Sequence, residues 1–132
     1  MNKRTLCLSA LCFLLPLRTF AKNKQHEKIM KSLSDLTSAA YHAYSVRQCQ
    51  DFYAYGSPEY NKFEPELDQA LNEYKKIRVN TKKLFRTIKN KDARDQFLKT
   101  FNLISDIPWA KQDKFSEALQ EIETLGMYLD ID

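Results

Sequence analysis

The chain has 132 residues, of which 43% are hydrophobic, with 21 basic and 17 acidic side chains. That length suits one compact domain with a single core and is too short for two. A total of two glycines excludes the glycine-rich loops that bind phosphates.

The first 21 residues have the three parts of a secretory signal peptide. Lys3 and Arg4 precede an uncharged, leucine-rich run from Thr5 to Leu17, and a small-x-small pair ends at Ala21. The apolar run is shorter than the roughly 20 residues that a membrane-spanning helix needs. We therefore expect cleavage after Ala21, a mature helical domain of residues 22–132, and an exported protein that is periplasmic or secreted.

Loss of the signal peptide changes both the charge and the cysteine count. Three basic residues leave with it, so the mature chain has 18 basic and 17 acidic side chains and is close to neutral. Cys7 and Cys12 leave as well, which excludes a disulfide-stapled fold and means that stability comes from packing. Cys49 is then alone in an oxidising compartment, where we expect it either to be buried or to form an intermolecular disulfide.

The mature chain is expected to be all-α, because Gly56 alone breaks it between residues 22 and 125 and no alternating runs typical of strands are present. Apolar residues recur at three- and four-residue steps in four segments, which are residues 26–55, 65–88, 92–105 and 112–128. The Gly56-Ser57-Pro58 turn ends the first segment, Pro108 ends the third and Asp113 caps the fourth. Short connections between amphipathic helices favour a single antiparallel bundle of about four helices.

The first predicted helix has two apolar series rather than one. The series that begins at Ile29 stays on one face as far as Ala43, but Arg47 then falls on that face. A second series follows another face and consists of His42, Val46, Cys49 and Tyr53. Either different neighbours cover the two halves of this helix, or it kinks near Ser45, or Arg47 and the His42 face belong to a binding site.

Motifs for catalysis, metals and cofactors are absent from the sequence. It has no His-Glu-x-x-His, no paired Cys-x-x-Cys and no acidic calcium loop. His42 and Cys49 share a helix face but are about 10 Å apart along its axis, too far for a catalytic pair. We therefore expect no metal, no cofactor and no catalysis, with an enzyme of unknown class as a third alternative.

Charge is unevenly distributed along the mature chain. Residues 75–91 contain eight basic side chains and no acid, whereas residues 113–132 contain six acids and one lysine. The basic residues fall outside the apolar stripe of the second helix and predict an outward basic face. This face is solvated, or paired with the acidic last helix, or a binding surface for an anionic membrane or envelope component. The candidate residues for that binding are Lys75, Lys76, Lys82, Lys83, Arg86 and Lys89.

Aromatic residues are concentrated around Gly56, where residues 41–63 hold seven of the fourteen in the mature chain. Tyrosine brings a large contact area and little entropy to lose, which suits an interface, although it also suits the end of a bundle core. The protein-binding candidates are Tyr41, Tyr44, Arg47, Phe52, Tyr53, Tyr55 and Tyr60. Cys49 is the candidate for an intermolecular disulfide in the same region.

Together these features favour a small exported, non-catalytic helical protein that binds another exported or envelope protein, as an inhibitor, immunity factor or adaptor does. A homodimer through the aromatic region is one form of such binding. The alternative partner is an anionic envelope or membrane surface, bound through the basic face of the second helix. Nucleic acid fits the charge of that face but not the expected compartment.

Overall fold

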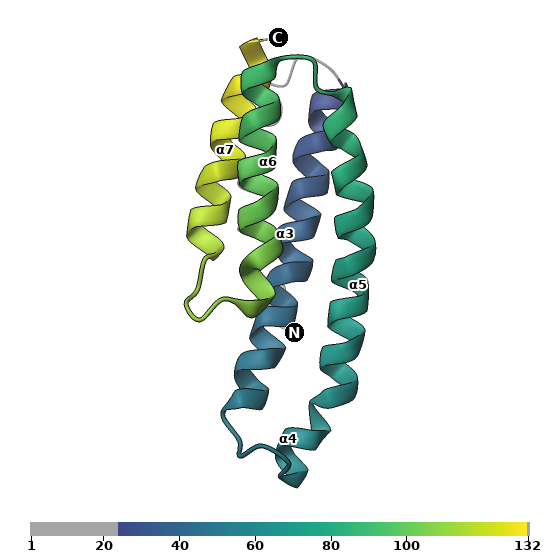
Figure 1. Cartoon of the computed structure of the whole chain (residues 1–132), viewed down its shortest axis with the longest axis vertical. Helices are drawn as coiled ribbons and strands as arrows, with labels where there is room; N and C mark the ends of the chain where they lie inside the picture. Colours follow the sequence, from purple (N-terminus) through teal and green to yellow (C-terminus); the bar gives the residue numbers. More distant parts are fainter. Residues whose placement is uncertain (1–23, 132) are drawn as a thin grey trace.

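The computed structural model describes residues 24–131, and the predicted signal peptide lies outside this range. Four long helices form an up-down-up-down antiparallel bundle, as the sequence predicted (Figure 1). The described residues contain no strand. The helices, including two short 3-10 segments, are α3 (Lys24–Asp51), α4 (Pro58–Lys62), α5 (Glu64–Lys83), η1 (Leu84–Thr87), α6 (Lys91–Asp106), η2 (Ile107–Trp109) and α7 (Phe115–Ile131).

The ends of the first two predicted helices differ from the prediction. α3 ends at Asp51, four residues before the predicted end. A tighter turn follows there, in which the Tyr53 N–H donates to the Gln50 carbonyl three residues back at 3.0 Å. Gly56, with φ of 79°, lies within the following reversal and does not end the helix itself. Ser57 then caps the additional helix α4 by accepting the Tyr60 N–H at 3.2 Å.

The remaining boundaries follow local capping. The second predicted helix is divided, because α5 gives way to the 3-10 turn η1 at Leu84. The Asn90 side chain caps α6 by accepting the Asp92 N–H at 2.8 Å. Asp113 caps α7 as expected, accepting the Phe115 N–H at 2.8 Å.

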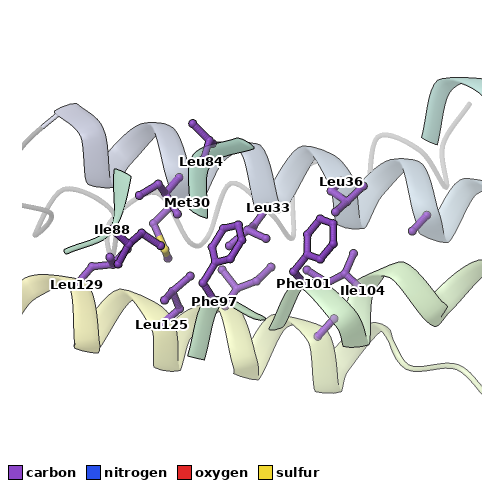
Figure 2. Packing of buried hydrophobic residues seen from close by; sticks show 14 of the residues in the cluster. Met30, Leu33, Leu36, Leu84, Ile88, Phe97, Phe101, Ile104, Leu125 and Leu129 are labelled. Carbon is purple, nitrogen blue, oxygen red and sulfur yellow. The ribbon is translucent and has the colours of Figure 1, made fainter. Parts of the chain in front are cut away.

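The main core lies where all four long helices meet. Phe97 and Phe101 of α6 stack at 6.0 Å between ring centres, with Leu33 of α3 on one side and Leu125 of α7 on the other (Figure 2). All four side chains are fully or almost fully buried. The bundle is therefore held by a continuous aliphatic and aromatic core, which needs no disulfide.

The bundle is stepped, because α3 and α5 continue past the connection between α6 and α7 (Figure 1). We call this part, residues 43–72, the hairpin extension. Its buried residues lie outside the main core cluster, although the half-buried Tyr44 and Leu71 at its inner end pack against that cluster. This interior is made of small or polar groups as well as aliphatic ones. The buried residues of the extension are Ala43, Val46, Gln50, Leu67 and Ala70.

The step explains the two apolar series of the first helix. At about 100° per residue, the buried side chains of α3 from His26 to Ala40 spread over one wide face, whereas Val46 and Gln50 lie roughly 60–100° to one side of Ile29. α6 and α7 cover only the first half of α3, and α5 covers the second. Different neighbours therefore account for the change of face, and α3 is one helix through Ser45.

Gly126 lies inside α7, where this helix passes close to α3. A methyl group there would lie 3.1 Å from the Met30 methyl carbon, which is the end of a flexible side chain. We expect Gly126→Ala to raise the free energy of unfolding by about 0.5–1 kcal/mol, because alanine favours the helix and Met30 can turn aside. Gly56→Ala is the matched control, since its positive φ makes alanine cost about 1–2 kcal/mol. Urea denaturation measures the free energy of unfolding of both variants. A less stable Gly126→Ala would show that the Met30 side chain cannot move away from the added methyl group.

Candidate functional site

Five aromatic residues lie in α4 or next to it in the chain, at the end of the hairpin extension (Figure 1). We call them the aromatic tip; they are Phe52, Tyr53, Tyr55, Tyr60 and Phe63. Tyr53 stacks on Phe63 at 6.0 Å and meets Phe52 edge-on at 5.2 Å, while Tyr55 lies 5.2 Å from Tyr60. Phe52 and Tyr55 remain 83% and 90% exposed. Two large rings are thus held against neighbours but covered by little else.

Hydrogen bonds from a buried glutamine position this tip. Gln50 is 2% exposed, and its side-chain nitrogen donates to the Glu64 carboxylate at 2.7 Å and to the Tyr60 carbonyl at 3.3 Å. These bonds join the end of α3 to α4 and to the start of α5. Asn61 adds a bond to the Gly56 carbonyl at 3.4 Å. The turn that displays Phe52 and Tyr55 is therefore anchored at both ends.

The surroundings of the aromatic tip are acidic. Residues 51–68 contain five acids and one base. Partial burial raises the pKa of the Tyr60 phenol above its ordinary value, and the carboxylates of Glu64 and Asp51 raise it further. Arg47 opposes that shift and is half-buried, with its Nε covered and no hydrogen-bond partner for it among the described residues. The candidate Arg47 thus lies beside the tip.

Two of the predicted candidates lie elsewhere. Tyr41 packs 4.8 Å from Phe115 at the start of α7 and donates to Asp113 at 3.4 Å. Tyr44 stacks on Tyr41 at 5.8 Å and packs against the main core. The aromatic cluster seen in the sequence is therefore two groups, one that joins α3 to α7 and one that forms the tip.

All six candidates of the basic face are exposed, and none is in an ion pair with another described residue. Pairing with the acidic last helix, one of the three interpretations, is wrong: α7 lies across the bundle from α5 (Figure 1), and its Glu121 instead pairs with Lys99 of α6 at 3.6 Å. Arg78 belongs to the same basic run but points inward. It donates to the Ser105 hydroxyl at 3.1 Å and lies 5.0 Å over the Phe101 ring.

The other reactive side chains considered in the sequence, His42 and Cys49, both lie on α3. Cys49 is a free thiol and is exposed, so the expectation of a buried cysteine is wrong. His42 is half-buried. Within residues 24–131 no group of three or more His, Cys, Asp or Glu side chains could hold a metal. None of the helices in that range is long and apolar enough to cross a membrane.

A pocket of about 510 Å³ at the connection between α6 and α7 was not predicted. Trp109, 52% exposed, lines it and meets Tyr74 edge-on at 5.8 Å. The signal available in the sequence is its single tryptophan, which directly follows Pro108 at the end of the third predicted helix. The other lining residues are Leu103, Asp106, Ala110, Lys111, Gln112 and Lys114.

No protein-family model, curated protein or solved structure matches the chain. Inference about its function therefore starts from its own residues.

Proposed function

We propose that the protein is exported and non-catalytic, and that its aromatic tip binds another exported or envelope protein, as an inhibitor, immunity factor or adaptor does. The observation that carries this proposal is the exposure of Phe52 and Tyr55 at the far end of the hairpin extension. Export rests on the signal-peptide pattern of residues 1–21.

The tip has the physical properties of a binding anchor. An aromatic side chain buries about 150–250 Å² in a contact, and it has few torsions to immobilise. The rings of Tyr53 and Tyr60 support their exposed neighbours from the side. Little of the surface therefore has to be ordered when a partner binds, which favours affinity.

The charge around the aromatic tip favours a partner with a basic surface. Five acids within residues 51–68 would be repelled by an anionic surface and attracted by a basic one. A suitable partner is a protein with an apolar pocket that accepts Phe52 or Tyr55 and carries lysine or arginine at its rim. Arginine and lysine also bind aromatic faces through cation–π contacts.

A binding experiment with matched variants tests the proposal. The mature chain is used to capture partners from an envelope extract, and the captured protein is then purified and titrated. We expect Phe52→Ser/Tyr55→Ser to weaken binding by at least about tenfold, because central aromatic anchors carry most of the energy of an interface. The control is Met127→Ser/Tyr128→Ser, which removes exposed apolar groups from α7, 60% and 36% exposed, and should bind as the parent does.

The same two variants also show which results would contradict the proposal. Unchanged binding by the tip variant, or equal weakening by both variants, would contradict a role for the tip. Binding that weakens with added salt would support the proposed basic rim, because exposed charge pairs are screened.

The second candidate function is attachment to an anionic envelope or membrane surface through the basic face. It is favoured by the six exposed basic side chains, which have no ion-pair partner among residues 24–131. The aromatic tip, which is surrounded by acids, would have to point away from such a surface.

A further inference from the structure

The charges of α5 change sign halfway along the helix. Residues 59–73 hold five acids and one base, and residues 75–91 hold eight bases and no acid. No charged side chain of α5 is in an ion pair with another residue of the described range, although Glu64 accepts a hydrogen bond from Gln50. The helix dipole favours acidic side chains in the first turn of a helix and basic side chains in the last turn, and its effect is confined to those two turns. The separation on α5 extends over its whole length.

Part of this charge forms a single stripe. At about 100° per residue, the stripe runs along one side of the helix, roughly 100° away from the buried Tyr74. We call it the α5 stripe; it consists of Glu64, Asp68, Leu71, Lys75, Val79 and Lys82, with Arg86 as its last member, turned further round the helix axis because it lies in the 3-10 turn η1. Leu71 is half-buried, Val79 is 54% exposed and the charged members are exposed.

The α5 stripe is complementary to itself when its direction is reversed. Lys75 lies at its centre, and every other member has a counterpart at the same separation on the opposite side of Lys75. The counterparts are Asp68 with Lys82, Glu64 with Arg86, and Leu71 with Val79. A second copy that is reversed end to end about Lys75 therefore places each acid opposite a base and the two apolar residues opposite each other. A parallel copy would place like charges together.

We propose that a second copy of this chain docks antiparallel on the α5 stripe and forms a two-fold symmetric dimer. Such an interface is isologous, so every favourable pair occurs twice. One helix pair buries less surface than most stable interfaces, which makes the dimer weak and sensitive to salt. Lys75 meets its own copy at the centre and limits the affinity further. The two aromatic tips lie at opposite ends of the dimer and stay free.

Variants that reverse the charge of one stripe residue, measured alone and mixed, provide the test. All proteins carry Cys49→Ser, so that no disulfide can link two copies, and sedimentation equilibrium at about 50 mM salt measures the dissociation constant. Asp68→Lys alone and Lys82→Asp alone should each raise it about tenfold or more, because two opposite-charge pairs become like-charge pairs. An equimolar mixture of the two variants should form heterodimers with a constant within about threefold of the parent. In the mixture, the new lysine at 68 faces the new aspartate at 82.

Controls on another side of α5 separate this pairing from net charge. Glu73→Lys and Lys76→Asp make the same charge changes outside the stripe and should leave the dissociation constant within about twofold. Lys75→Gln should lower it, because the central repulsion is removed. Circular dichroism confirms that each variant is folded.

Three results would overturn the dimer. They are a parent that is monomeric at low salt, a mixture that stays monomeric, and controls that weaken association as much as Asp68→Lys. A monomeric parent that binds phosphatidylglycerol vesicles through these lysines would assign the basic residues to a membrane surface instead.

Discussion

Phe97→Ala is expected to lower the free energy of unfolding by about 3–5 kcal/mol. The Phe97 ring is fully buried, stacks on Phe101 at 6.0 Å and lies 6.1 Å from Phe85. It stands between α3 and α7 (Figure 2), so its removal leaves a cavity that no single helix can fill by moving. Because a domain of this size has about 5–15 kcal/mol in total, this loss is a large share of the stability and should move the urea midpoint far below that of the parent.

Urea denaturation followed by circular dichroism measures this loss, and Phe52→Ala is the matched control. Phe52 is the same residue type but 83% exposed, so its removal should change the free energy of unfolding by less than about 0.5 kcal/mol. Equal losses at the two positions would mean that the aromatic tip is part of the core and is not a free surface.

The helical class and the main core could be predicted because the relevant signals are local. Ala93, Phe97, Phe101 and Ile104 recur at three- and four-residue steps, and all four are buried in α6. Asp113 indicated the start of α7 for a similar reason, since a cap acts on the next turn of its own helix.

The stepped shape could not be predicted, because it depends on how far one helix reaches along another. The two apolar series in the first helix indicated two sets of neighbours, and the structure confirms that interpretation. Nothing local showed that α6 and α7 cover only the first half of α3, or that Gln50 would be buried. The end of α3 at Asp51 was missed because residues 52–55 have no strong helix breaker.

The same limit applies to the candidate site. The sequence placed seven aromatic residues near one turn, but whether each ring is covered depends on α7, which begins only at Phe115, far along the chain from that turn. Phe115 reaches Tyr41 but not the tip. The core description is therefore correct for Tyr44, which packs against the main core, whereas an interface at the exposed rings of the tip stays a prediction.

Hydrogen exchange should divide the molecule at the step. We expect amides of residues 43–72 in helical hydrogen bonds to exchange at least about 100-fold faster than those at the centre of α6. Only the two helices α3 and α5 cover the interior of the hairpin extension. That interior consists of small residues, Val46, Leu67 and the polar Gln50. It can open without exposing Phe97 or Phe101, so opening there costs less free energy than global unfolding.

Gln50→Ala should enlarge this difference. The substitution removes the two hydrogen bonds that join the end of α3 to Tyr60 and Glu64, and it leaves a cavity where the buried Gln50 side chain lies. Exchange should accelerate about tenfold within the extension and stay unchanged in α6 and α7, because those helices do not contribute to that interior. Uniform exchange across the parent, or acceleration in α6 of the variant, would show that the extension and the four-helix part unfold as one unit.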